Sequence, residues 1–271
     1  MTRSDKAKAV SSKFKPIKGL RVLLSNDDGI NAPGLKSLEK IARTISDDIW
    51  IVAPEQEHSG ASHSLSLHDP LRMRQVSKQK FAIQGTPTDC VLMAVNHIFK
   101  DGKKPDLLLS GVNRNGNLAE DVTYSGTVAA AMEGLLAGIP SVAMSQLLSR
   151  GHPCKWATAE IHAPAILRKL VDGGWPSNVL ININFPDVVA DKVTGVEVCK
   201  LGHRDLGDMF VDERTDARGE TYYWIGYREV VGKPGAKTDL AVMEQGGISV
   251  TPLHIDLTHK PTQAKLAKLL A

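Results

Sequence analysis

The stretch GLRVLLSNDDGINAPGL, residues 19–35, decides the fold, because it joins an apolar run directly to two adjacent carboxylates. Residues 20–24 contain a single polar side chain, which is typical of a short buried strand. Asp27 and Asp28 follow as soon as this run ends. Two neighbouring carboxylates at the mouth of a buried strand repel each other and cost stability unless a positive group lies beside them. The stretch therefore predicts a cation at the end of the first strand.

Strand-like and helical patterns alternate along the first two-thirds of the chain. Strand-like runs occupy residues 21–25, 48–54, 81–85, 105–111, 140–145 and 178–186. Helical patterns lie between them, at residues 34–45, 86–99, 125–138 and 155–172. This alternation predicts an α/β fold with a mostly parallel sheet and helices on both faces.

The composition narrows the class of protein. With 271 residues, 42% of them hydrophobic and 23% charged, the chain fits one globular α/β domain. The net charge of +3 is too small to indicate stable nucleic-acid binding, and no run approaches the roughly 20 apolar residues of a membrane span. The 3 cysteines form no CxxC pair, so neither a disulfide framework nor a thiolate zinc site is indicated. A reducing, cytoplasmic setting is the simplest expectation.

Domain boundaries follow changes in composition. Residues 1–18 are strongly basic and predict a flexible tail, with a nucleic-acid arm as the alternative. Residues 19–271 are expected to form one domain with its core at about 19–190. A β-rich extension is expected at about 195–257, and a C-terminal helix at about 261–271. A long hairpin is marginal alone, so the extension is expected to pack on another subunit.

Polar residues follow three of the predicted strands. Asp27 and Asp28 follow the first, Ser59 follows the strand that ends at Pro54, and Asn113 follows the run LLLSG. The carboxyl ends of parallel strands meet at one edge of a sheet, where such folds bind ligands. Carboxylate, hydroxyl and amide oxygens suit Mg²⁺, Mn²⁺ or Ca²⁺. An isolated Asp-Asp-Gly is more often a turn closed by an Asx cap, and that alternative stays open.

A second set of residues suits an anion. Ser125, Gly126 and Thr127 begin a helix, where free N–H groups favour phosphate, although simple capping explains them equally well. Further donors for phosphate lie in Gly-rich loops, at Gly60, Arg114, Asn115 and Asn117. Asp121 and His254 are candidate accessory groups, with surface or buried structural roles as alternatives, and His58 and His63 flank Ser59.

Taken together, these motifs resemble the SurE (survival protein E) family. The resemblance rests mainly on LLSNDDGINAPGL, APEQEHSGASHSLSL and SGVNRNGNLAEDVTYSGTVAAAMEG, and it extends from about Gly19 to about Thr258. Any one motif is weak evidence, whereas the combination is highly specific. One departure is the loop after Asn113, which runs Arg-Asn-Gly-Asn where an earlier small residue is expected.

The resemblance implies a metal-dependent phosphohydrolase of nucleoside 5′- and 3′-monophosphates, with exopolyphosphatase activity as a side reaction. It also implies a Rossmann-like core and a C-terminal extension exchanged between the subunits of a dimer or tetramer. One Mg²⁺ or Mn²⁺ per subunit would be held by Asp27, Asp28, Ser59 and Asn113. The anion would lie at Ser125, Gly126 and Thr127.

Three alternatives to attack by a metal-activated water remain at this stage. One of the catalytic candidates, Asp27 or Asp28, could instead form an aspartyl phosphate, although such enzymes usually space their acids as Asp-x-Asp. The same fold could serve as a nucleotide sensor without turnover. Finally, the two aspartates could close a turn and hold no metal.

Overall fold

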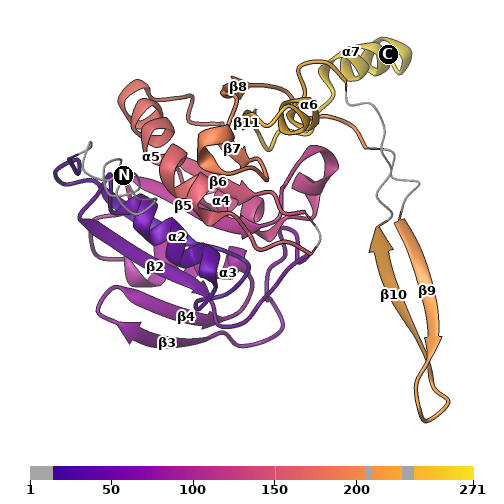
Figure 1. Cartoon of the computed structure of the whole chain (residues 1–271), viewed down its shortest axis with the longest axis horizontal. Helices are drawn as coiled ribbons and strands as arrows, with labels where there is room; N and C mark the ends of the chain where they lie inside the picture. The colour runs from indigo at the N-terminus through magenta and orange to yellow at the C-terminus, as the bar shows by residue number, and fades with distance from the viewer. Residues whose placement is uncertain (1–14, 150, 205–208, 228–234) are drawn as a thin grey trace.

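The computed structural model describes residues 15–149, 151–204, 209–227 and 235–271, so most of the predicted basic tail lies outside it (Figure 1). Its centre is a nine-stranded sheet in the order β3-β4-β2-β1-β5-β6-β7-β11-β8. The strands are β1 (Arg21–Ser25), β2 (Asp48–Pro54), β3 (Arg72–Ser77), β4 (Lys80–Gln84), β5 (Leu107–Arg114), β6 (Ser141–Gln146), β7 (Leu180–Phe185), β8 (Val196–Val198) and β11 (Ile248–Leu253).

The sheet is mostly parallel, which confirms the predicted α/β fold. β4, β2, β1, β5, β6 and β7 run in one direction, as their pairings show. β3 pairs with β4 in the antiparallel sense, and β11 does the same with β7. The carboxyl ends of the parallel strands therefore lie along one edge of the sheet, called here the carboxyl edge.

Helices cover both faces of the sheet. α2 (Pro33–Ala42) and α5 (Trp156–Gly173) lie on one face, and α3 (Pro87–Met93) and α4 (Gly126–Leu136) lie on the other. The predicted helix over 86–99 is divided, because α3 continues as a π-helical turn over Ala94–Ile98. Two 3₁₀ turns lie in the connections: η2 (Ala119–Thr123), with two buried residues, precedes α4, and η3 (Ala190–Lys192), with none, follows β7.

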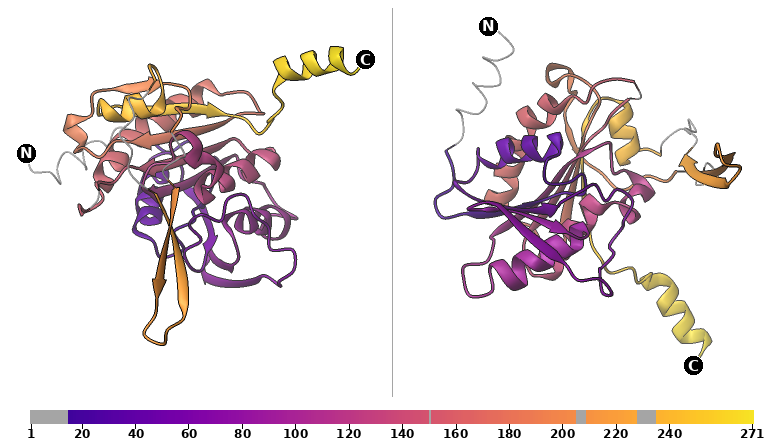
Figure 2. Two further views of the ribbon diagram at one scale, coloured as in Figure 1. Left: turned by 90° about the vertical axis from the view of Figure 1, so that its right-hand side faces the viewer. Right: turned by 90° about the horizontal axis from the view of Figure 1, so that it is seen from below.

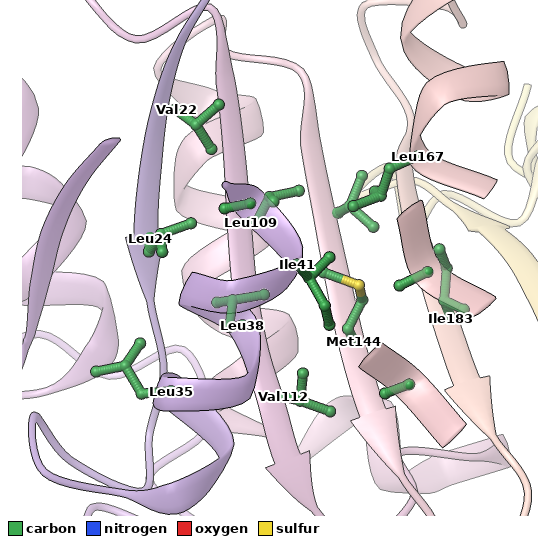
Figure 3. Close-up of a cluster of buried hydrophobic side chains, with 14 of the residues drawn as sticks. Val22, Leu24, Leu35, Leu38, Ile41, Leu109, Val112, Met144, Leu167 and Ile183 are labelled. Atoms are coloured by element: carbon green, nitrogen blue, oxygen red, sulfur yellow. The ribbon is translucent and has the colours of Figure 1, made fainter. Parts of the chain in front are cut away.

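The first strand is buried on both sides, as its sequence predicts. Val22 and Leu24 enter one hydrophobic cluster, while Leu23 enters the other on the opposite face. Figure 3 shows the first cluster, in which Leu35 and Leu38 of α2 pack onto the strands. Both faces of β1 exclude water, so the carboxylates that follow this strand lie at its carboxyl edge and not on a face of the sheet.

The last third of the chain divides between the sheet and two projecting elements. β9 (Met209–Thr215) and β10 (Thr221–Tyr227) form a separate antiparallel hairpin that stands away from the core (Figures 1 and 2). α7 (Lys260–Leu269) also projects and has no buried residue. Of the β-rich extension expected over 195–257, only the hairpin β9–β10 stands away from the core. β8, β11 and the short helix α6 (Asp239–Glu244) pack with the core.

No helix in the described ranges is both long enough and apolar enough to cross a membrane.

Candidate functional site

The site is built where β1 and β5 end side by side. The two strands pair in parallel, with Ser25 opposite Ser110. Beyond this pair, Asp27 is 4% exposed and Asp28 is half-buried. Asn113 lies in the last part of β5 itself, because the strand runs to Arg114 and is longer than the predicted 105–111. The register of β5 against β6 shifts between Ser110 and Asn113, which marks an irregular end to the strand.

Asp27 contacts the start of helix α4. The Thr127 hydroxyl donates a hydrogen bond to Asp27 Oδ1. Gly126 makes this approach feasible, because a Cβ atom on Gly126 would lie 2.7 Å from the Asp27 Cβ. The predicted anion-binding start of α4 and the first of the paired aspartates are therefore in direct contact.

Asp28 faces β5 instead. Its Oδ2 accepts a hydrogen bond from the backbone N–H of Arg114 at 3.3 Å, next to Asn113. The two carboxylates thus diverge, one toward α4 and one toward β5.

Burial makes both carboxylates difficult to ionise. Burial raises the pKa of Asp27 to about 6; the hydrogen bond from Thr127 opposes this shift, and the charge on Asp28 adds to it. Burial also raises the pKa of Asp28, and the charge on Glu57 contributes in the same direction. A cation beside the pair would favour the ionised forms of both groups.

The turn after β1 is closed by another residue. Asn26 Nδ2 donates to the Gly29 carbonyl at 3.0 Å, so Asn26 supplies the side-chain bond across this turn. Gly29 has φ +98°, and a Cβ atom there would lie 3.2 Å from the backbone of Gln56. The side chains of Asp27 and Asp28 point to α4 and β5 rather than across the turn, which weakens the Asx-cap alternative.

Ser59 is held near the end of β1 by a backbone hydrogen bond of the preceding residue, His58. The His58 N–H donates to the Asp27 carbonyl at 2.8 Å, which brings the segment carrying Ser59 against the end of β1. Ser59 is exposed, and its hydroxyl donates to Glu57 Oε1 at 2.8 Å. The hydroxyl oxygen keeps acceptor capacity for a cation.

Asn113 and Asn115 form the opposite side of the site. Asn113 Nδ2 donates to the Asn115 carbonyl at 2.9 Å, which orients the amide through its nitrogen. Asn115 is exposed, has φ 111°, and accepts the Gly116 N–H on its own Oδ1 at 2.9 Å.

The anion candidates have distinct local roles. Ser125 Oγ accepts the Val128 N–H at 3.0 Å, so Ser125 caps α4, as the simpler alternative predicts. Capping uses the Ser125 oxygen and leaves other N–H groups of the first turn available to a ligand. Gly60 is exposed with φ +76° and has open space around it.

Asn117 lies in a buried polar network. Its Nδ2 donates to Ser145 Oγ at 2.8 Å, and its N–H donates to Asn184 Oδ1 at 2.8 Å. Its carbonyl accepts from the side chains of Asn182 and Asn184. These contacts tie the loop after β5 to β6 and β7 and give Asn117 a structural role, and its expected phosphate contact stays a prediction.

The two accessory candidates differ in their positions, and Asp121 lies beside the start of α4, where its carbonyl accepts the Ser125 N–H at 3.0 Å. Asp121 caps η2 by accepting the Leu118 N–H and pairs with Arg204 at 3.0 Å, and both contacts are structural. Because β11 is antiparallel to β7, its last residue Leu253 lies opposite Leu180, the first residue of β7. His254 therefore lies at the edge opposite the site, and the expectation that it reaches the site is not met within one chain.

The donor set is compatible with a hard divalent cation. Two carboxylates, one hydroxyl and one amide oxygen approach the same edge, and Mg²⁺ and Mn²⁺ prefer such oxygen ligands. Within the described ranges no group of three or more His, Cys, Asp or Glu side chains could hold a metal ion. A cation at this edge would therefore depend on Ser59 and Asn113 as well as on the aspartates.

One contact near the site is absent from the sequence-based prediction. His63 Nε2 lies 2.9 Å from Glu133 Oε2 on α4, and the two side chains are 31% and 13% exposed. The residues are 70 positions apart, so no local pattern joins them. The sequence offers only a histidine in the loop that carries the candidate ligand Ser59, without any sign of its partner.

Comparison with known proteins identifies a family and several relatives. The model of the family described as Survival protein SurE matches residues 22–208. A protein named 5′-nucleotidase SurE from Parvibaculum lavamentivorans is 57% identical over 251 residues, which cover 92% of this chain and 90% of the relative. Another of that name, from Paramagnetospirillum magneticum, is 57% identical over 250 residues, or 91% of this chain and 95% of the relative.

A solved structure extends the likeness to three dimensions. The crystal structure of the SurE protein from Aquifex aeolicus aligns with a TM-score of 0.80 at 35% identity, covering 93% of this chain and 100% of that chain. The residues matched by the family model include every member of the proposed cation and phosphate sites. The chain belongs to the SurE family.

Proposed function

We propose that the chain is a divalent-cation-dependent phosphohydrolase that releases phosphate from nucleoside 5′-monophosphates. The enzyme class, 5′-nucleotidase, follows from family membership and from identities of 53–57% to proteins of that name. The observation that carries the metal site is that three separate segments contact Asp27 and Asp28. Thr127 of α4 bonds to the Asp27 carboxylate, the Arg114 N–H of β5 bonds to the Asp28 carboxylate, and the His58 N–H bonds to the Asp27 carbonyl.

The proposed cation ligands are Asp27, Asp28, Ser59 and Asn113, and the cation is Mg²⁺ or Mn²⁺, one per subunit. A bound cation of this kind supplies Lewis-acid chemistry, since it polarises a phosphoryl group and makes a water molecule more acidic. The remaining contributions come from the chain itself. Asp28 is half-buried and accessible enough to take up the proton of the attacking water.

The start of α4 is the proposed phosphate cradle. Gly126 lets the helix approach Asp27 closely, and Thr127 orients that carboxylate. N–H groups of the first turn and the positive end of the helix dipole would stabilise charge on the phosphoryl oxygens. Gly60 and Asn115, both exposed beside the site, are proposed to contact the same phosphate.

The residues in this site recognise a phosphoryl group and leave the base unspecified. We therefore extend the proposal to 3′-monophosphates and to the terminal phosphate of polyphosphate, as secondary substrates.

An aspartyl-phosphate mechanism is the nearest rival. It needs one carboxylate aimed at the phosphorus and the next carboxylate placed to assist. Asp27 is held by Thr127 and is 4% exposed, while Asp28 points away toward β5. This divergence favours direct attack by water.

A nucleotide panel tests the proposal. Phosphate release is measured from 5′- and 3′-monophosphates and from tripolyphosphate, with Mg²⁺ or Mn²⁺ and with chelator, and acid-quenched samples are searched by mass spectrometry for a phosphorylated aspartate. We expect metal-dependent release from the 5′-monophosphates and no phosphorylated protein. Stoichiometric nucleotide binding without release would favour the sensor, and phosphate trapped on Asp27 or Asp28 would favour an aspartyl phosphate.

Assembly and location complete the proposal. The exposed hairpin β9–β10 carries large apolar side chains, including Ile225 at 71% exposure, and we propose that it packs on further copies of the chain in a dimer or tetramer. All three cysteines are unpaired, which is consistent with a reducing, cytoplasmic compartment.

A further inference from the structure

The segment 55–71, which joins β2 to β3 and carries Ser59, has no buried residue. Of its three leucines, Leu65 and Leu67 are 46% and 77% exposed. Leu71, at the end of the segment next to β3, is partly buried and packs against the hydrophobic core. Burial of apolar surface therefore contributes little to holding the part of the segment around Ser59 in place. Its position relative to the candidate site depends on polar contacts.

Most of these contacts involve the backbone. The His58 N–H donates to the Asp27 carbonyl, and the Ser62 N–H donates to the Tyr124 carbonyl at 3.2 Å. Thr86 Oγ1 donates to the Ser64 carbonyl at 2.8 Å. The segment thus lies along the turn that precedes α4 and along the start of α3.

One contact joins two side chains across a longer distance in the sequence. His63 Nε2 lies 2.9 Å from Glu133 Oε2, and Glu133 is 13% exposed. An ionised carboxylate can only accept hydrogen bonds, so the imidazole Nε2–H donates. Glu133 lies about two turns after Thr127 on α4, so one helix contacts both Asp27 and the segment that carries Ser59.

We propose that His63 and Glu133 are a positioning pair that holds Ser59 in register with Asp27 and with the start of α4. The proposal rests on the proposed function, in which Ser59 is a cation ligand. Neither side chain touches the reacting atoms. The pair fixes the segment to the helix that already orients Asp27, so that the ligands from β1 and from residues 55–71 are set by one rigid element.

The expected effect of losing the pair is a weaker cation site in a folded protein. Without the pair, the segment spends part of its time away from α4, and the apparent affinity falls in proportion to the fraction of competent conformers. For this partly exposed pair, a hydrogen bond of typical net strength corresponds to a loss of about fivefold to tenfold in cation affinity. The KM for nucleotide should change less than the cation requirement.

The first test is hydrogen exchange in metal-free protein. We compare wild type, His63→Ala, Glu133→Ala and Glu133→Gln, and follow the amides of His58 and Ser62. The two alanine variants should exchange faster at these amides, whereas Glu133→Gln keeps an acceptor and should stay near wild type. The control is His162→Ala, which removes a half-buried histidine with one 2.9 Å hydrogen bond on α5. Unchanged exchange in His63→Ala and Glu133→Ala would overturn the proposal.

The second test is Mn²⁺ binding by calorimetry, without substrate. His63→Ala and Glu133→Ala should each weaken binding about fivefold to tenfold, and the double variant should be no weaker than either. Wild-type affinity in His63→Ala would overturn the positioning role even if exchange had changed. Asp28→Asn separates this failure from that of the proposed function: a wild type that binds Mn²⁺ no better than Asp28→Asn has no cation site, which overturns both proposals.

Discussion

Asp27 is a carboxylate with 4% of its surface exposed, next to a second carboxylate, and burial raises its pKa to about 6. Such a group lowers the stability of the metal-free protein at neutral pH, because ionising it in the folded state costs more than ionising it in the unfolded chain. The same two features, burial and a neighbouring negative charge, make the position attractive to a cation. Stability and function therefore oppose each other at this residue.

The variant Asp27→Asn should stabilise the metal-free protein. It removes the buried charge and keeps an oxygen that accepts from Thr127. We expect a gain of about 1–3 kcal/mol in the free energy of unfolding at pH 8 with chelator, measured by urea denaturation. Adding Mn²⁺ should raise the Tm of wild type and leave that of the variant unchanged.

The control for this experiment is Asp101→Asn, in an exposed turn before β5. It should change stability by no more than about 0.5 kcal/mol. A metal-free Asp27→Asn protein less stable than wild type would contradict the view that the carboxylate is a cost in the absence of a cation.

Gly126 is the second residue on which the site depends. A Cβ atom at this position would lie 2.7 Å from the Asp27 Cβ and 3.1 Å from its Oδ2. Gly126→Ala should therefore displace Asp27 from the start of α4, lower the stability by about 1–3 kcal/mol and reduce phosphate release. Urea unfolding and phosphate release measure the two effects.

Gly173→Ala is the matched control, because Gly173 ends α5 and a Cβ atom added there would have no other atom within 4 Å. It should retain full activity and equal or slightly higher stability. Full activity and wild-type stability in Gly126→Ala would show that the contact between α4 and Asp27 does not need glycine.

At the scale of elements, the connection from β6 to α5 is fixed by a carboxylate after β7. Asp187 accepts from Lys155 Nζ at 2.5 Å and from the Ser149 N–H at 3.0 Å. Burial opposes ionisation of Asp187, but these two donors outweigh it and lower the pKa of Asp187. The ionised carboxylate thus holds two points of the connection at the carboxyl edge.

A lowered pKa in the folded state makes the contribution of Asp187 depend on pH. Its stabilising effect is fully present above the unfolded pKa of about 4 and is lost as pH falls toward the folded pKa. The difference in stability between wild type and Asp187→Asn should be constant above about pH 5 and shrink below it, as measured by urea unfolding from pH 7 to pH 3. Asp172→Asn, an exposed partner of Arg168, is the control and should show no such change. A difference for Asp187→Asn that stays constant down to pH 3 would contradict this assignment.

How far the sequence predicts the structure depends on whether the relevant contact is local. β1 and the two aspartates lie in one short run of the sequence. The pattern of apolar residues followed by acidic residues is therefore enough to predict the strand and the position of the carboxylates at its end. The same holds for the start of α4, whose cap Ser125 and whose Gly126 are adjacent.

Other features depend on partners far along the chain. The side chain of Asn117 donates a hydrogen bond to Ser145 of β6, and no local sequence pattern predicts that contact. The antiparallel direction of β11 is set by pairing with β7, and this pairing places His254 at the opposite edge. His63 is 70 positions from Glu133, so the sequence shows a histidine in a loop and not the helix that holds it.

At the scale of the whole molecule, two elements project from the core with apolar side chains. In the hairpin β9–β10, Val211 is 65% exposed and pairs with Ile225, which is 71% exposed. Leu257, which lies shortly before α7 in the sequence, is 93% exposed, and Leu270, which directly follows α7, is 81% exposed. A two-stranded hairpin is marginally stable alone, so we expect contact with other copies of the chain to stabilise it.

Light scattering after gel filtration tests this expectation. Wild type should have at least twice the 29.3 kDa mass of one chain. Ile225→Glu places a charge in the proposed contact and should lower the mass or make it depend on concentration. Thr221→Glu, an exposed residue at the start of β10, is the matched control and should behave as wild type. A wild-type mass of one chain would contradict assembly through the hairpin.

The central claim is that a divalent cation at Asp27 and Asp28 drives hydrolysis of a nucleoside 5′-monophosphate. The most direct measurement is the rate of phosphate release against Mn²⁺ concentration for wild type, Asp28→Asn and Asp101→Asn, with chelator as the zero point. We predict release that requires Mn²⁺, falls by at least about a hundredfold in Asp28→Asn and is unchanged in Asp101→Asn. Release that persists in chelator, or that survives in Asp28→Asn at the same Mn²⁺ concentration, would contradict the account.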